Sequence, residues 1–227
     1  LPSGVIIDEC ARGSGSTCDL IHRGPTGSLW TETPQDYVSA NYQNIGKLST
    51  KGIDVLASYR LDLPKGNKLA FQLDGTYTMS FLTQNIEGGP MYDCVGFYGQ
   101  ICGAPLPAWR HVLNSTWQTP WAGLDLTFRW RFIGPSSVDG TSQNPQMTGP
   151  YYVGADHIPG YNYLDFSAAM PIGSNVDLRV GVNNIADKNP PLVPSDSCLT
   201  ITCNDNTWVG TYDALGRYIY GHITIKF

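Results

Sequence analysis

The chain has 227 residues, of which 15% are charged and 11% are aromatic, together with 25 glycines and 16 prolines. Such a composition, poor in charge and rich in turn residues, favours one large all-β domain. The net charge of −5 leaves no basic surface for nucleic acid. No apolar run approaches the roughly 18 residues of a membrane-spanning helix, so a spanning role requires a β-barrel.

The first third of the chain predicts a short strand, a loop and a long strand. A partial strand is expected at residues 3–8, and residues 9–36 form a loop rich in Gly, Ser and Thr. The next strand covers about residues 37–63, with an irregular stretch near Gly46. Pro64, Gly66 and Asn67 follow it and predict a tight turn, because such residues supply the dihedral angles of a chain reversal.

Residues 69–82 give the clearest strand pattern. Side chains alternate between the two faces of a strand, and here one face is apolar and the other polar. The apolar set is Leu69, Phe71, Leu73, Tyr77, Met79 and Phe81, and the polar set is Gln72, Asp74, Thr76, Thr78 and Ser80. A second long loop is expected at residues 83–107.

The same alternation continues to the end of the chain. Strands are predicted at 109–118, 124–133, 161–171, 176–183 and 216–227, with tight turns at 119–121 and 172–175 and long loops at 134–160 and 186–215. Arg60, Arg129, Arg131 and Arg179 all fall on the polar face. This placement fits a membrane wall, because an Arg facing lipid at mid-depth costs about 2–4 kcal/mol.

Short turns and long loops alternate along the chain as regularly as apolar and polar side chains alternate along the strands. About eight strands are joined by tight turns and by loops of about 25–30 residues in strict alternation, which is typical of outer-membrane proteins. The sequence therefore predicts an antiparallel transmembrane β-barrel wall with short periplasmic turns and long extracellular loops. A soluble sheet that buries its apolar face against a second sheet is the alternative.

Six cysteines form three close pairs in the long loops. They permit 15 connectivities, of which neighbour pairing is the most economical, namely Cys10 with Cys18, Cys94 with Cys102 and Cys198 with Cys203. No histidine lies at zinc spacing, so disulfides in an oxidising compartment are favoured over a metal site. Each bond should restrict the unfolded chain by about 2–3 kcal/mol.

The sequence contains no catalytic constellation and predicts no enzyme activity, no cofactor and no metal site. Its four histidines are scattered, and none stands beside a nucleophile. The loops instead carry aromatic side chains, whose faces bind sugars, aromatic siderophores or heterocycles. The candidate ligand contacts are Tyr92, Tyr98, Tyr151, Tyr152 and Trp208. Packing of these rings within the loops is the alternative.

Three segments resemble the TonB-dependent outer-membrane receptors. Residues 181–191, GVNNIADKNPP, are similar to the family pattern G-x-x-N-L-F-D-x-x-P-P, with Ile185 and Ala186 in place of Leu and Phe. Residues 41–59, with Asn44 and the KGID stretch at 51–54, resemble a strand of that family. Phe227 is similar to the terminal aromatic residue that directs barrel proteins into the membrane.

The resemblance implies a barrel of about 22 strands filled by a plug domain. Residues 1–227 are then expected to be the C-terminal portion of the barrel, lacking the plug, the N-terminal strands and the TonB-binding segment. The implied partners are the remaining barrel, TonB, outer-membrane lipid and an extracellular ligand, either an iron-siderophore or a carbohydrate. A complete eight-stranded barrel serving as an anchor or adhesin, and a secreted β-sandwich that binds carbohydrate, remain open.

Overall fold

The computed structural model describes residues 3–13, 15–28, 34, 36–40, 46–85, 88–198, 203 and 206–226. The chain divides into two compact units. The first comprises Leu1–Lys47 with Gln84–Met91, and the second comprises Leu48–Thr83 with Tyr92–Phe227. Each unit is described below by itself.

The first unit is partly helical, so the predicted strand at residues 3–8 is wrong. Helices α1 (Ser3–Ala11) and α2 (Gly15–Cys18) precede a short hairpin of β1 (Ile21–His22) and β2 (Tyr37–Val38). The run Val5, Ile6, Ile7 favours a strand by propensity. Its environment decides otherwise, because Ile6 is fully buried and Cys10 is paired with Cys18, which joins the end of α1 to α2.

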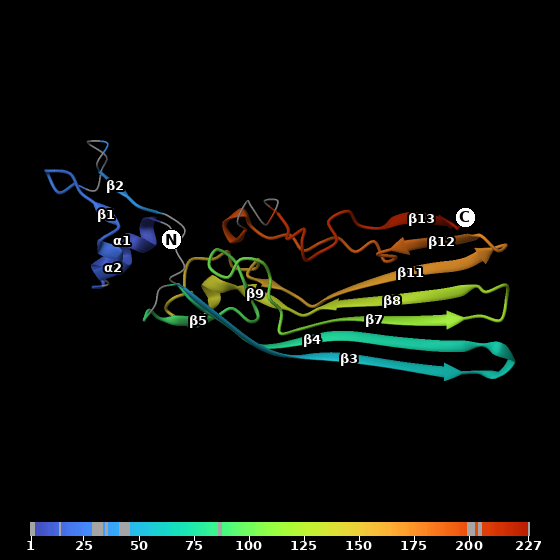
Figure 1. The fold of residues 1–227 in the computed structure, drawn as a ribbon. Coiled ribbons are helices and arrows are strands. Elements are labelled where there is room, and N and C mark those ends of the chain that lie inside the picture. The colour runs from blue at the N-terminus through green and yellow to red at the C-terminus, as the bar shows by residue number, and fades with distance from the viewer. Residues whose placement is uncertain are drawn as a thin grey trace. The chain divides into compact units, whose positions relative to one another are not determined.

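The second unit is built on one antiparallel sheet (Figure 1). Its strands follow chain order: β3 (Lys47–Asp62), β4 (Lys68–Gln84), β7 (Trp109–Gln118), β8 (Asp125–Ile133), β11 (Tyr161–Ile172), β12 (Val176–Asn183) and β13 (Tyr218–Ile225). The short strand β5 (Met91–Asp93) pairs with β4 as the eighth member. The predicted strand at 37–63 is therefore two elements, β2 and β3, and only β3 belongs to this sheet.

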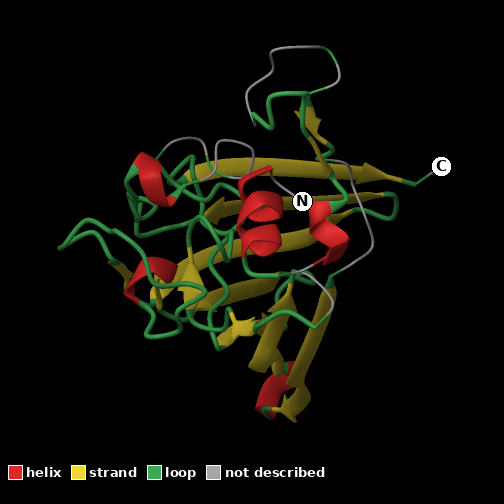
Figure 2. Cartoon of the chain, turned by 90° about the vertical axis from the view of Figure 1, so that its left-hand side faces the viewer, coloured by secondary structure: helices red, strands yellow, loops and turns green. Residues whose placement is uncertain are grey.

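Tight turns and long connections occupy opposite ends of the strands, as predicted. The turns include the 3-10 helix η1 (Pro64–Gly66) and the positive φ angles of Gly123 (71°) and Gly173 (67°). Trp117 Nε1 donates to Asn67 Oδ1 at 3.0 Å and ties the first turn to β7. The described parts of the long connections in this unit, residues 92–108, 134–160, 184–198 and 206–217, gather at the other end of the sheet, which faces the viewer in Figure 2.

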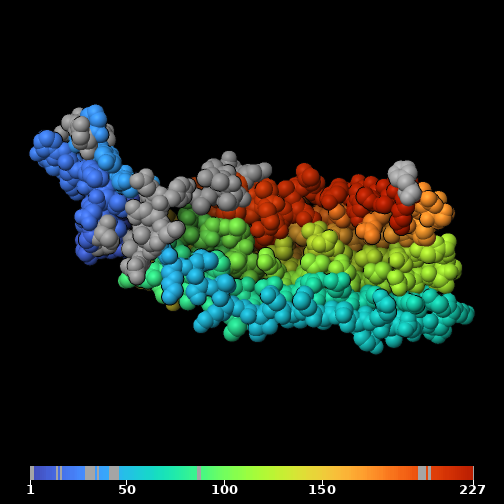
Figure 3. All heavy atoms as spheres, viewed as in Figure 1, coloured from blue at the N-terminus to red at the C-terminus, as the bar shows by residue number. Residues whose placement is uncertain are grey.

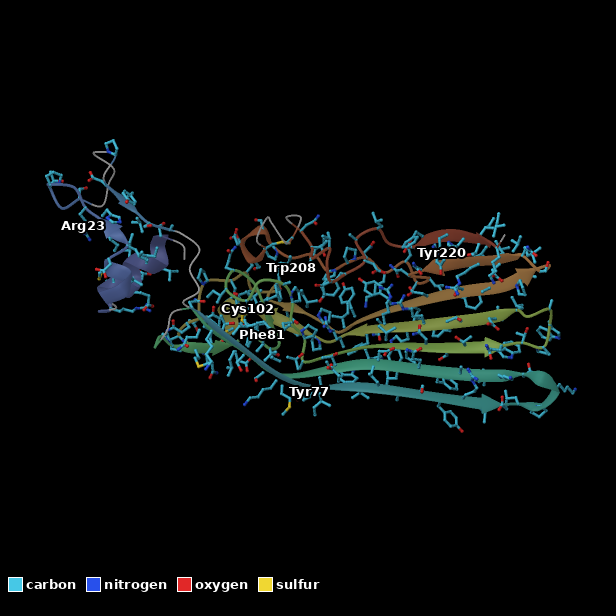
Figure 4. The ribbon with its side chains drawn as sticks, in the orientation of Figure 1. Arg23, Tyr77, Phe81, Cys102, Trp208 and Tyr220 are labelled. Atoms are coloured by element: carbon cyan, nitrogen blue, oxygen red, sulfur yellow. A yellow bond between two sulfur atoms is a disulfide. The ribbon has the colours of Figure 1, made fainter. Side chains whose placement is uncertain are left out.

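The apolar face of the sheet is left uncovered by the described residues. Strand register places Leu73 opposite Leu113, and Ala168 opposite Val180, on this face. Exposed side chains on it include Phe128, Val180, Ile219 and Ile223, and Figure 4 shows Tyr77 pointing away from the ribbon. In the space-filling view the colours of these residues follow one another across the sheet from cyan through green and orange to red (Figure 3). Exposure of so many large apolar side chains on one face is typical of a surface that contacts a membrane or another protein.

Aromatic rings mark both ends of this apolar band on β7. Trp117 lies 5.8 Å from Trp121 at the turn end, whereas Trp109 and His111 contact each other at the loop end. A Cβ on Gly75 would lie 2.5 Å from the Trp109 indole, so the glycine makes room for that ring. Eight residues separate Trp109 from Trp117, about 26 Å along a strand. If the strand is tilted by about 40° from the membrane normal, this length spans a height of roughly 20 Å, which is close to the height of about 25 Å of the apolar band in outer-membrane barrels.

The buried core of the second unit lies among the long connections and the first residues of β11 rather than under the rest of the sheet. Two clusters of side chains at 8% exposure or less make up this core, and we call them together the loop cap. The larger cluster contains Tyr98, Val138, Ile158, Tyr161, Tyr163, Val193, Cys198, Cys203, Trp208 and Tyr212. The smaller cluster contains Tyr92, Cys94 and Met147. Strands β6 (Phe97–Tyr98), β9 (Ser136–Val138) and β10 (His157–Ile158) form a small sheet inside the loop cap. Two 3-10 helices, η2 (Asp139–Thr141) and η3 (Ser195–Ser197), complete the cap.

Within the described part of the chain, every helix is too short or too polar to cross a membrane.

Candidate ligand site in the long loops

A cleft of about 420 Å³ opens within the loop cap, and all three long connections line it. This volume lies within the range of about 300–1,000 Å³ that is usual for small-molecule sites. The first connection contributes Gln100 and Ile101, and the third contributes Asp196 and Ser197. The second connection supplies the remaining lining residues, which are Val138, Asp139, Gly140, Met147, Thr148, Gly149, Pro150, Tyr151 and Tyr152.

Asp139 holds the first and second connections together beside this cleft. Its Oδ2 atom accepts hydrogen bonds from the backbone N–H groups of Ile101 (2.7 Å) and Cys102 (3.0 Å). The backbone at Gly99 approaches so closely that a Cβ there would collide with the Asp139 carboxylate. Asp139 is only 4% exposed. Because its carboxylate is buried, these hydrogen bonds hold the first connection in place and have a structural role.

A second contact joins the first connection to the third. Gln100 Nε2 donates to the backbone carbonyl of Asp196 at 2.6 Å. In the structure Cys94 is paired with Cys102 and Cys198 with Cys203, each with a Cα–Cα distance of 5.5 Å. Both pairs therefore lie in segments that border the cleft. Formation of the three disulfides in the cell stays a prediction.

The five predicted ligand contacts separate into two groups. Tyr92, Tyr98 and Trp208 are 6%, 0% and 1% exposed, so their rings pack inside the loop cap; Figure 4 shows Trp208 among the long connections. Tyr151 and Tyr152, by contrast, line the cleft and are 44% and 58% exposed. For these two residues ligand contact stays a prediction, and for the other three the structure favours packing.

Sequence reasoning missed the polar residues of the cleft. Asp139 and Gly140 begin η2, and a local Asp-Gly pair gives no sign of a ligand site. Gln100 and Asp196 carry no local signal, because their meeting depends on how two distant connections fold. The one usable sign was the closeness of Gln100 to Cys102, within a segment that a disulfide would hold in place.

On the polar face of the wall, an ion-pair cluster fastens the third connection to the sheet. Arg131 on β8 contacts Asp165 on β11 at 2.9 Å and Asp213 of the connection at 2.6 Å. The Asp213 N–H donates to the Tyr163 hydroxyl at 3.2 Å, and Arg131 Cζ lies 4.9 Å from the Tyr163 ring centre. The predicted polar-face placement of Arg131 is thus confirmed.

Asn184, within the 181–191 segment, has a structural role. Its side chain donates to the Lys188 carbonyl and accepts from the Lys188 N–H, both at 2.9 Å, while its own N–H donates to Asp165 at 2.8 Å. It is fully buried and adopts a φ of 51°, which Asn tolerates better than most residues. The segment therefore sets how the chain leaves β12.

Buried tyrosines of the loop cap stay protonated. Burial, followed by the nearby Asp156 and Asp139 carboxylates, raises the pKa of Tyr98 to about 12. Burial also raises the pKa of Tyr212, with smaller effects from neighbouring tyrosines. Neither phenol is a base at neutral pH, and among the described residues no three His, Cys, Asp or Glu side chains gather to hold a metal ion.

An antiparallel sheet with an uncovered apolar face, tight turns at one end and a folded loop cap at the other is the wall of a membrane β-barrel. Residues 16–185 match the family model described as TonB dependent receptor-like, beta-barrel, and the chain belongs to this family. Comparisons with curated proteins and with solved structures gave no match.

Family membership fixes the general setting of the chain. These receptors are transporters of the bacterial outer membrane rather than enzymes, and in general they work with a plug domain and with TonB. Two parts of the sequence resemblance, residues 41–45 and the terminal Phe227, lie outside the described residues. The membrane-insertion role of Phe227 therefore stays a prediction.

Proposed function

We propose that this chain is the C-terminal portion of a receptor barrel that imports a scarce extracellular nutrient, such as a ferric siderophore, with energy supplied through TonB. The observation that carries the proposal is the division of the second unit into an apolar-faced wall and a loop cap with its own core and cleft. The wall meets lipid, and the cap captures the ligand outside the cell.

The edges of the sheet support a larger barrel. Strands β3 and β13 stand at the two ends of the sheet order, and nearly all of their residues are exposed. Backbone groups at such edges need partners in a membrane, because unsatisfied N–H and C=O groups are costly in hydrocarbon. Further barrel strands would satisfy them, and a plug would fill the lumen beside the polar face.

The alternative functions fare worse. A secreted β-sandwich requires a second sheet over the apolar face, and no described element covers that face. A complete small barrel requires closure, whereas β3 and β13 remain separate edges in the described sheet. The length of the gene upstream of these residues distinguishes a receptor from a small barrel.

Transport by the parent receptor tests the proposal directly. We expect the purified receptor to show heat-modifiable mobility on gels, as folded outer-membrane barrels do. Uptake of radiolabelled iron from ferric siderophores, or of the nutrient that replaces them, should be lost in a strain lacking TonB. A protein that is soluble without detergent, or uptake that persists without TonB, contradicts the proposal.

A further inference from the structure

The long connections are strongly acidic. Residues 85–108, 134–160 and 184–217 contain only two basic residues, Lys188 and Arg217, whereas their acidic residues are Glu87, Asp93, Asp139, Asp156, Asp187, Asp196, Asp205 and Asp213. A surface with one sign of charge repels ligands of the same sign and attracts those of the other. The loops therefore oppose the capture of an anionic ligand.

Both basic residues are engaged away from the cleft. Lys188 Nζ lies 4.0 Å from the centre of the Tyr161 ring, in a cation–π contact. Arg217 interacts with Asp187, through a backbone N–H at 2.8 Å and a guanidinium at 3.9 Å. No Lys or Arg lines the cleft, so a phosphate, sulfate or carboxylate entering it would meet the exposed Asp196 without a counter-charge, with the buried Asp139 carboxylate nearby.

The charged groups of the cleft are hydrogen-bond acceptors only, whereas the hydroxyls of Ser197, Tyr151 and Tyr152 can both donate and accept. Gln100 already donates to the Asp196 carbonyl, and the Thr148 hydroxyl donates to the Ser142 carbonyl. Carboxylate oxygens of Asp139 and Asp196 are acceptors only. A ligand group that contacts the exposed Asp196 carboxylate must itself donate, as hydroxyl and ammonium groups do.

Two exposed tyrosine rings complete the lining. Tyr151 and Tyr152 are adjacent in sequence and lie beside the apolar Ile101, Val138 and Met147. Ligands with both an apolar C–H face and many hydroxyl donors suit such a surface, because the face packs on the ring while the hydroxyls bond to carboxylates. Pyranose rings have this combination.

We propose that the cleft binds a non-acidic saccharide, either neutral or amino-substituted. Its sugar faces pack on Tyr151 and Tyr152, and its hydroxyls donate to the exposed carboxylate of Asp196. This inference rests on the proposed nutrient-receptor function and narrows the ligand from the siderophore-or-carbohydrate pair to one chemical class. The absence of Lys and Arg from the lining predicts that acidic saccharides and anionic ferric complexes do not bind.

A glycan array tests the ligand class with the parent receptor in detergent. The array carries neutral, amino and acidic oligosaccharides, and a ferric tris-catecholate complex is measured in parallel. We expect binding confined to the neutral or amino glycans. Binding to acidic glycans or to the ferric complex, or a blank array, overturns the inference.

Cleft variants locate the site on the molecule. Tyr151→Ala and Tyr152→Ala should each weaken glycan binding by about tenfold, given the contribution of one aromatic contact. Val153→Ala is the matched control, because Val153 follows them in sequence, is 90% exposed and does not line the cleft. Equal affinities for all three variants would place the ligand elsewhere.

A charge reversal separates electrostatics from shape. Asp196→Lys should weaken binding of amino glycans and admit acidic ones; unchanged selectivity contradicts the argument from charge. Heat-modifiable mobility is measured on the same preparations, and TonB-dependent uptake of radiolabelled glycan or iron is measured in cells that express the receptor. If both persist while the array stays blank, only the saccharide inference fails, whereas their loss refutes the receptor function itself.

Discussion

The protonation state of Tyr98 makes the stability of the loop cap depend on pH. Its ring is fully buried, and its hydroxyl donates to the Ala155 carbonyl at 3.4 Å. Burial and the nearby Asp156 and Asp139 carboxylates both disfavour the phenolate, which raises the pKa to about 12. The aromatic residue chosen as a ligand contact is thus a core residue that must remain neutral.

A titration of Tyr98 is expected to show this raised pKa. The unfolded phenol has a pKa of about 10, so its contribution to cap stability is complete below pH of about 10 and is lost as pH rises towards 12. The tyrosinate absorbance of the wild type minus that of Tyr98→Phe should therefore rise near pH 12. A difference curve centred near pH 10 would show that Tyr98 is solvated.

Between elements, Arg131 determines how the third connection meets the wall. Its guanidinium bridges Asp165, whose side chain is 6% exposed, and Asp213, whose side chain is 24% exposed. Removing one partner of a buried ion pair is costly because the remaining charge is left without compensation. The connection is held by this charge cluster as much as by apolar packing.

Replacement of Arg131 should release the third connection without unfolding the wall. For Arg131→Gln we expect a loss of about 3 kcal/mol in the docking of residues 184–217, seen as faster protease cleavage within that segment. Arg129→Gln is the control, since Arg129 is an exposed residue on the polar face of the same strand. If both variants resist protease equally, the cluster does not fasten the loop.

For the whole molecule, the decisive property is which solvent meets each face of the sheet. Leu73 and Gln72 are neighbours on β4, opposite Leu113 and Asn114 of β7, and they point to opposite faces. The two positions lie at nearly the same depth and differ mainly in the medium they meet. A charge placed at each in turn compares the two media.

Arginine at these two positions should have unequal effects. Leu73→Arg is expected to lower the free energy of unfolding in lipid by about 2–4 kcal/mol, whereas Gln72→Arg, beside Asp74, should change it little. Urea unfolding of the receptor in lipid vesicles, together with the heat-modifiable fraction, measures both. Similar losses for the two variants would indicate that the apolar face is not in contact with lipid.

Much of the wall was predictable from local pattern. Period-two alternation specifies which side chains share a face, and the observed register pairs apolar with apolar residues, as in Leu113 with Trp130. Turn chemistry was equally clear at Pro64 and at Gly173. The helix α1 was not, because Val5, Ile6 and Ile7 favour a strand until packing and the Cys10–Cys18 pair are known.

The cleft was predictable only in part. Aromatic composition indicated Tyr151 and Tyr152, yet the same reasoning selected Tyr92, Tyr98 and Trp208, which are core residues. Ring chemistry alone does not distinguish a stacking face from a packed ring. Exposure does, and it depends on contacts between segments far apart in the chain.

The amino-acid sequence by itself determined the strands, their two faces, the tight turns and the family, because these depend on residues a few positions apart. Only the tertiary structure decided where the core lies and which aromatic residues remain open to a ligand. Different loops are joined by the parallel pairing of β6 with β9 and by the hydrogen bond from Gln100 to the Asp196 carbonyl. Such contacts join residues far apart in the chain, so no local sequence pattern predicts them.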